Sequence, residues 1–255
     1  MWTWRTLAVG YDVSAYLVRG MLVDTGFRHV APALVRALAE LSPRGIVVTH
    51  WHEDHAGNAP ELAARFPMWM PAATEATLRA RPQVRLYRRF TWGRPTRLEG
   101  TVTALDPAPL RTIATPGHSA DHHVVFDDAT RTLISGDLWL GVKVRVMGRD
   151  ENPYEIIESL TRVIALEPQR MFDAHRGLVE NPVAALAAKR SWLEETTGDI
   201  ERRLDAGQSE SQILDEALGG EERTAVVSQG EYSRRNLIRC IRRHRPLGGN
   251  GMKEA

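Results

Sequence analysis

The chain has 255 residues, of which 43% are hydrophobic and 25% are charged, and its formal net charge is +1. This length is enough to bury a full core, and it fits one large domain with at most a small addition. The composition is that of an ordinary globular protein. A net charge so close to zero supplies no global field that would attract nucleic acid or an anionic membrane.

Three features of the sequence predict a cytoplasmic protein. The single cysteine, Cys240, cannot form a disulfide within the chain, which fits a reducing compartment. The first residues lack the basic segment and following apolar stretch of a signal peptide. No apolar run approaches the roughly 18 residues that a membrane helix needs, so we expect no membrane partner.

Two hydrophobic periods alternate through the first 175 residues and predict a mixed α/β core. Alternating or continuous apolar runs predict strands at 13–18, 20–23, 45–49, 67–70, 101–105, 110–115, 122–127, 131–136 and 170–174. Runs with a period of 3.6 predict helices at 32–41, 58–66, 74–80 and 153–166. Residues 81–99 are rich in Arg, Pro and aromatic residues without a clear period, which predicts an irregular insertion over one edge. From about residue 180 the pattern is helical only, with helices expected at 182–204, 209–218 and 231–244.

Histidine and aspartate gather directly after the predicted central strand 45–49. Residues two apart in an extended segment point the same way, so His50 and His52 can converge on one metal ion. The chain then turns, and Asp54 and His55 can face a second position. Imidazole and carboxylate ligands suit Zn²⁺, whereas softer metals would call for thiolates. The helix-borne His-Glu-x-x-His zinc site is excluded because position 56 is Ala.

The segment Thr49-His50-Trp51-His52-Glu53-Asp54-His55-Ala56-Gly57 resembles the His-x-His-x-Asp-His signature of the metallo-β-lactamase superfamily. Four further segments resemble the other conserved motifs of that family and follow in the same order, namely residues 22–26, 115–119, 135–137 and 174–177. The resemblance implies an α/β protein with the four-layer αββα sandwich of that family and a small C-terminal helical appendage. We therefore expect a metallo-β-lactamase-like catalytic domain at 1–180, a helical region at 181–245 and a disordered tail at 246–255.

The resemblance also implies seven metal ligands in two groups that share Asp137, namely His50, His52 and His118 in one group and Asp54, His55 and His175 in the other. Seven ligands are too many for one tetrahedral ion, but they fit two ions with a shared carboxylate and an open position for water. The expected cofactor is two Zn²⁺ per chain, with Mn²⁺ or Fe as alternatives. A hydroxide held between the ions would attack a carbonyl carbon or phosphorus, and Asp54 is the catalytic candidate for orienting it.

Two further residues are expected to support the ligands, because metal-bound histidines usually donate their second N–H to a carboxylate or carbonyl. Asp24 is placed to brace the loop 50–55. His122 lies four residues after His118, where family members often carry another histidine, and the alternative is an exposed histidine at a strand start. Three residues are candidates for contacting the substrate, two through their cationic groups and one from a helix start, namely Lys143, Arg145 and Tyr154.

The arrangement as a whole resembles the β-lactamase-like protein 2 and glyoxalase II groups, although Asp173-Ala174-His175 stands where both usually have Pro-Gly-His. The leading hypothesis is hydrolysis of a small ester, thioester or lactone. An alternative, cleavage of single-stranded RNA, rests on the arginine-rich last helix with Arg234, Arg235, Arg239, Arg242, Arg243 and Arg245. A second alternative is a mononuclear iron oxygenase of the persulfide type, which the complete second ligand group disfavours. The sequence predicts a small-molecule partner and no particular oligomeric state.

Overall fold

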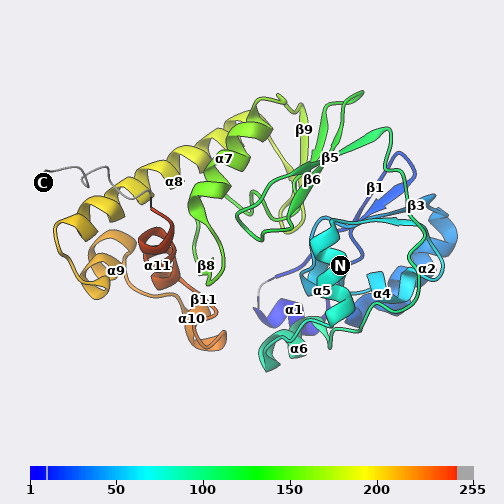
Figure 1. Cartoon of the computed structure of the whole chain (residues 1–255), viewed down its shortest axis with the longest axis horizontal. Helices are drawn as coiled ribbons and strands as arrows, with labels where there is room; N and C mark the ends of the chain where they lie inside the picture. Colours follow the sequence, from blue (N-terminus) through cyan, green and yellow to red (C-terminus); the bar gives the residue numbers. More distant parts are fainter. Residues whose placement is uncertain (10, 246–255) are drawn as a thin grey trace, which may run out of the picture.

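The computed structural model describes residues 1–9 and 11–245, and the tail 246–255, predicted to be disordered, lies outside the described residues. Two main sheets lie near the middle of the molecule, with helices on both outer sides (Figure 1). The first sheet has the order β1-β2-β3-β4, with β1 (Tyr16–Val18), β2 (Met21–Val23), β3 (Gly45–Val47) and β4 (Met68–Trp69). The second has the order β10-β9-β7-β6-β5, with β5 (Leu110–Ala114), β6 (His123–Asp127), β7 (Thr132–Ile134), β9 (Arg170–Asp173) and β10 (Gly177–Val179).

A two-stranded sheet joins β8 (Met147–Gly148) to β11 (Tyr232–Ser233). The helices are α1 (Trp4–Val9), the 3₁₀ helix η1 (Arg28–Val30), α2 (Ala31–Leu41), α3 (Glu53–Ala56), α4 (Ala59–Leu62), α5 (Ala72–Ala80), α6 (Leu86–Trp92), α7 (Pro153–Ile164), α8 (Pro182–Asp205), α9 (Glu210–Leu218), α10 (Arg223–Val227) and α11 (Arg234–His244). None of these helices combines the length and the apolar character needed to cross a bilayer.

The layers follow from the alternation of side chains along each strand, because successive residues of a strand point to opposite faces. In β2, Leu22 packs with residues of α2, α4 and α5, whereas Val23 belongs to a cluster between the two sheets. In β6, Val125 belongs to that same central cluster, whereas Val124 packs with residues of α7 and α8. The order helix, sheet, sheet, helix is the predicted four-layer αββα sandwich, which is confirmed.

The strand directions bring the chemically distinctive loops to one edge of the sandwich. β5 and β7 are each antiparallel to β6, and β9 is parallel to β7, so β5, β7 and β9 run the same way. β2 and β3 are parallel in the other sheet. The residues that follow the carboxyl ends of these five strands are, in chain order, Asp24, His50, His118, Asp137 and His175.

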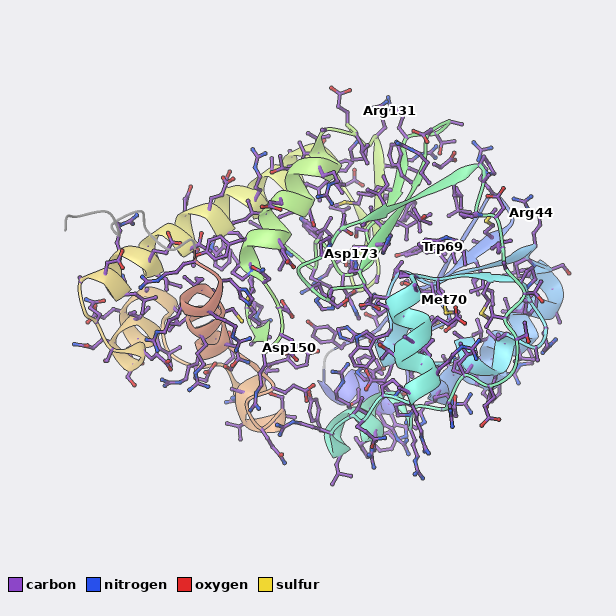
Figure 2. All side chains as sticks on the ribbon, in the orientation of Figure 1. Arg44, Trp69, Met70, Arg131, Asp150 and Asp173 are labelled. Atoms are coloured by element: carbon purple, nitrogen blue, oxygen red, sulfur yellow. The ribbon has the colours of Figure 1, made fainter. Side chains whose placement is uncertain are left out.

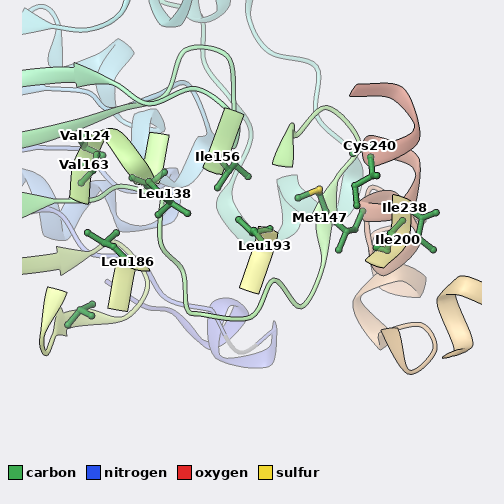
Figure 3. Packing of buried hydrophobic residues seen from close by; sticks show 14 of the residues in the cluster. Val124, Leu138, Met147, Ile156, Val163, Leu186, Leu193, Ile200, Ile238 and Cys240 are labelled. Atoms are coloured by element: carbon green, nitrogen blue, oxygen red, sulfur yellow. The ribbon is translucent and has the colours of Figure 1, made fainter. Parts of the chain in front are cut away.

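A single hydrophobic cluster continues from the second sheet into the C-terminal helices (Figure 3). Leu160 of α7, Leu193 of α8 and Ile238 of α11 are all fully buried in it, together with Met147 of β8. Residues on both sides of the predicted boundary at 180 therefore share one core. The long helix α8 lies along α7 in Figure 1, and α9 and α11 pack beyond it.

Three segments differ from the sequence predictions. The segment 81–99 is not wholly irregular but contains α6, whose buried Arg88 interrupts the apolar period by which a helix is recognised. The strand expected at 101–105 is only an isolated bridge between Met68 and Ala104. The N-terminus, where no element was predicted before residue 13, forms α1.

Candidate metal centre

Seven side chains, from the four segments that follow β3, β5, β7 and β9, converge at the shared edge of the two sheets. His50, His52, His118 and Asp137 each offer one atom within 4.8 Å of the others, and Asp54, His55 and His175 do the same. The first three histidines are called the first ligand group below, and Asp54, His55 and His175 the second ligand group. The structure thus brings together every ligand that the motifs predicted, over 126 residues of chain from His50 to His175.

The two groups meet at Asp137, which is buried and lies between them. In the first ligand group, His118 Nε2 lies 3.2 Å from Asp137 Oδ2. In the second ligand group, the Nε2 atoms of His55 and His175 lie 3.1 and 3.2 Å from Asp137 Oδ1. Each carboxylate oxygen therefore faces a different set of imidazoles, as a carboxylate shared by two cations requires.

The first ligand group presents three ring nitrogens to one point. His52 Nδ1 lies 3.0 Å from His50 Nε2 and 3.0 Å from His118 Nε2. Burial lowers the pKa of His50 and of His52 well below the usual range, which keeps both rings neutral. Neutral imidazole is the form that binds a metal ion.

A buried hydrogen-bond relay from Asp24 sets the orientation of two ligands. The Thr49 hydroxyl donates to Asp24, at 2.9 Å from Oδ2, so the N–H at His50 Nδ1 donates to Thr49 Oγ1 at 3.0 Å. The N–H at His55 Nδ1 donates directly to Asp24 Oδ2 at 2.8 Å. Both rings therefore turn Nε2, and not Nδ1, toward Asp137. The placement of Asp24 agrees with the expectation that it braces the loop 50–55.

His122 is fully buried, and both of its ring nitrogens are used within the protein. The backbone N–H of Asp137 donates to His122 Nε2 at 3.0 Å, so the N–H at His122 Nδ1 donates to Thr115 Oγ1 at 2.8 Å. The ring cannot bind a metal in this arrangement. It holds the peptide of Asp137, the carboxylate that both ligand groups face.

The remaining polar atoms indicate what the centre is built to hold. His55 Nε2 and Asp137 Oδ1 are buried and have no hydrogen-bond partner in the part of the chain that the structure describes, although they lie 3.1 Å apart. A buried acceptor without a donor is unfavourable by roughly 1–3 kcal/mol, so converging lone pairs of this kind call for cations. Imidazole nitrogen and carboxylate oxygen are donors that divalent transition metals accept. The residues present fit a centre with two metal ions.

Two aspartates that sequence analysis did not select connect the ligand loops to one another. Asp173, fully buried near the middle of the molecule (Figure 2), accepts from the backbone N–H of His175 and of Leu140, both at 3.0 Å. It thereby links the last ligand loop to the loop after Asp137. Asp121 accepts from the Trp51 backbone N–H at 3.0 Å and from the Thr74 hydroxyl at 2.6 Å. The only sequence signal for either residue was an acid beside a metal-ligand motif.

The three predicted substrate residues do not join the metal ligands. Lys143 is exposed, and the Arg145 side chain is 73% exposed and lies 3.8 Å from Glu222. The Tyr154 hydroxyl donates to Glu201 of α8. Tyr154 therefore directs its polar end to the C-terminal region and not to the metal centre.

The arginines of α11 are largely matched by acids of neighbouring helices. The carboxylate of Glu210 lies within 4.0 Å of three arginines, namely Arg235, Arg239 and Arg242. Arg234 pairs with Glu222, and Arg245 pairs with Asp205. The opposite face of the helix is buried, with Leu237, Ile238 and Ile241 in the core. The helix is therefore a packed element on which five of the six arginines named above lie beside acids, whereas Arg243 donates to the Arg149 carbonyl.

Comparison with known families agrees with this geometry. The profile of the metallo-β-lactamase superfamily matches residues 8–190, and the chain belongs to that superfamily. A metallo-β-lactamase family protein from Thermus thermophilus shares the fold, with a TM-score of 0.56 and 19% identity over 91% of this chain and 85% of that chain. The resemblance inferred from the five motifs is confirmed.

Curated relatives match over part of their length. The lactamase-like protein vrtG of Penicillium aethiopicum is 32% identical over 63% of this chain and 49% of its own. The β-lactamase-like protein 2 homolog of Drosophila melanogaster is 28% identical over 66% and 58%. An atrochrysone carboxyl ACP thioesterase of Aspergillus chevalieri is 29% identical over 48% and 37%. The chain spans about half the length of the first two relatives.

Proposed function

We propose that the protein is a dinuclear zinc hydrolase that acts on a small ester, thioester or lactone. The observation that carries this proposal is the position of Asp137, whose two oxygens face two separate and complete ligand groups. When bound, the two ions would supply Lewis acidity and a water acidic enough to act as a nucleophile near neutral pH. A single iron would leave one of the two groups without a function, which disfavours the oxygenase alternative.

The chain's own residues would provide positioning and proton handling. Asp54 is the more exposed of the two ligand carboxylates, with its side chain 10% exposed against 7% for Asp137, and its Oδ2 lies 3.4 Å from His175 Nε2. A carboxylate at the open side of the centre is suited to orient a water molecule and to accept its proton. Asp24 and His122 act through the ligands that they hold, by fixing imidazole direction and the peptide of Asp137.

The substrate class rests on two arguments. One relative carries thioesterase in its name, and thioesters, esters and lactones share an electrophilic carbonyl that one nucleophile can attack. The RNA alternative loses its main support, because an arginine already paired with a carboxylate contributes little to binding a phosphate backbone. We therefore favour a small-molecule substrate.

The test is a panel of thioesters, esters, lactones, phosphodiesters and labelled single-stranded RNA, assayed with zinc-, manganese- and iron-loaded protein. We expect turnover of a carbonyl substrate with two zinc ions per chain. Cleavage of RNA with inactivity toward every carbonyl substrate would overturn the substrate assignment. One iron per chain with oxygen consumption would overturn the hydrolase assignment.

A further inference from the structure

A second candidate binding site has none of the metal ligands in its lining and is formed largely by the segment between α5 and β5. It is a cavity of about 360 Å³, called the arginine cavity here, lined by Arg28, His29, Arg81, Gly93, Arg94, Pro95 and Thr96. Its wall combines η1, the end of α5 and the loop after α6. All of the charged residues in this lining are basic.

The backbone brings these residues together through two unusual conformations. Arg81 ends α5 with a φ of +63°, in the left-handed region, and Gly93 ends α6 with a φ of +99°. A Cβ atom at position 93 would lie 2.5 Å from Arg28 Cβ. Only glycine therefore allows the loop 93–96 to close onto Arg28 and complete the cavity wall.

Of the three arginines that line the arginine cavity, one is balanced by an acid and two are not. Arg28 is paired with Glu61 at 2.5 Å. Within the described part of the chain, neither Arg81 nor Arg94 has a carboxylate within 4.0 Å, and the Arg81 Nε–H donates only to the Pro95 carbonyl at 3.3 Å. His29 Nε2 lies 2.7 Å from Arg5 Nη1. Among the described residues, the guanidinium groups of Arg81 and Arg94 therefore have no carboxylate partner.

The local sequence reinforces the imbalance. Residues 76–98 contain seven arginines and no acidic residue, at positions 79, 81, 85, 88, 89, 94 and 97. The net charge of the whole chain is only +1, so it does not reveal this local concentration of positive charge. Such a cluster produces a local positive potential that favours an anion.

An unpartnered hydroxyl in the wall of the cavity also points to a ligand. The Thr96 Oγ1 atom is buried and has no hydrogen-bond partner among the described residues. Leaving such a group unsatisfied costs roughly 1–3 kcal/mol, so buried hydroxyls in native proteins nearly always have a partner. A ligand that accepts hydrogen bonds would satisfy this donor.

We propose that the arginine cavity binds the phosphoryl group of a small phosphorylated compound. Planar guanidinium groups donate pairs of parallel hydrogen bonds to phosphate oxygens. The two unbalanced charges of Arg81 and Arg94 match the charge of about −1.5 to −2 on a phosphate monoester at neutral pH. The volume lies within the range of small-molecule sites and leaves room for the organic part of the ligand. This proposal does not depend on the hydrolase assignment.

The experiment titrates the full chain with inorganic phosphate by calorimetry, at constant ionic strength maintained with chloride. We expect the double variant R81Q/R94Q to weaken phosphate binding by about tenfold or more, because two charge-assisted contacts are lost. The matched control is R97Q. Arg97 lies in the same segment, but its Nε–H donates to the Arg79 carbonyl and it does not line the cavity. We expect R97Q to bind phosphate as the unmodified protein does.

A second variant, T96V, separates binding from folding. Removing the unsatisfied hydroxyl should raise the melting temperature slightly in phosphate-free buffer, yet weaken phosphate binding several-fold. Unchanged affinity in R81Q/R94Q would overturn the proposal, since phosphate would then be bound elsewhere, including at the metal centre. Equal losses in R97Q would overturn it in favour of non-specific charge attraction. Tighter binding of citrate than of phosphate would overturn the phosphoryl assignment in favour of a carboxylate ligand.

Discussion

The ligands that follow β3 and those that come from the second sheet are held in different ways. His50 and His55 are both fully buried, and both depend on Asp24 for their orientation. His118 and His175 lie nearer the open side, and their Nδ1 atoms face Glu151 at 3.5 Å and the Asp12 carbonyl at 2.5 Å. One half of the centre is therefore preorganised by a single buried carboxylate, while the other half relies on separate contacts near the rim.

The largest effect should follow from removing the residue that joins the two halves. We expect D137A to lose at least one metal ion per chain and to reduce activity to background, because both ligand groups lose their shared carboxylate. Metal content by elemental analysis checks this outcome. The control D128A changes an exposed aspartate paired with Arg111 and should retain both ions. Full metal content and activity in D137A would contradict a bridging role.

The second largest effect should be on the free energy of unfolding, when the buried arginine next to the loop 50–55 is replaced. Arg88 is buried between Glu53, which lies among the ligands, and Glu231, whose Oε1 is 2.9 Å from Arg88 Nη1. We expect R88M to reduce the free energy of unfolding by about 3–5 kcal/mol, because Glu53 is left buried without its partner. Chemical denaturation measures this change.

The matched control for R88M is a change at Arg85, the residue directly before α6. Arg85 also approaches Glu231, at 3.4 Å, but its side chain is 38% exposed and it makes no ion pair with Glu53. We expect R85M to change the unfolding free energy by about 0–1 kcal/mol. Equal destabilisation by the two variants would show that Glu53 does not depend on Arg88.

The comparison between the two halves is tested directly by changing one supporting acid on each side. We expect D24N to weaken metal binding by about 10–100-fold at both ions, since it disturbs His50 and His55 together. The rim variant E151Q should weaken binding at the first ligand group alone, and by less, because Glu151 lies 3.5 Å from His118. Metal titration with a competing chelator measures both. Equal effects would remove the proposed difference between the halves.

The smallest effect should be the dependence of metal binding on pH. Burial opposes protonation of His118, but its contacts with Asp137 and Glu151 prevail and raise its pKa to about 10. The metal-free protein therefore holds a proton there at pH 7, and a metal ion must displace it. We expect metal affinity to rise with pH below 10, roughly tenfold per unit for each released proton, and the raised pKa values of His55 and His175 can add to the proton of His118. Calorimetry in buffers of different ionisation enthalpy counts that proton, and no proton release would contradict the assignment.

The amino-acid sequence determined the ligands and the layer order. The ligands lie soon after strands, in short motifs. Their metal-binding chemistry can be predicted from residues that are close together in the sequence. The layers follow from side-chain alternation, which is also a local property, as in Leu22 and Val23. Asp24 and His122 could also be predicted from the sequence, because a metal-bound histidine needs a second hydrogen-bond partner.

Only the tertiary structure decided which polar groups meet across long stretches of chain. Arg88 reaches Glu53 and Glu231, and Asp173 joins two ligand loops, through contacts that no local pattern encodes. The same reason explains the arginine-rich last helix, in which Arg235, Arg239 and Arg242 share the single carboxylate of Glu210 from another helix. It also explains why the sequence did not single out Arg81 and Arg94, which have no carboxylate partner among the described residues. Both lie in the segment 81–99, which was predicted to be an irregular insertion. The energy of a charge depends on its neighbours in space, and the sequence alone does not say which charges the fold leaves unpaired.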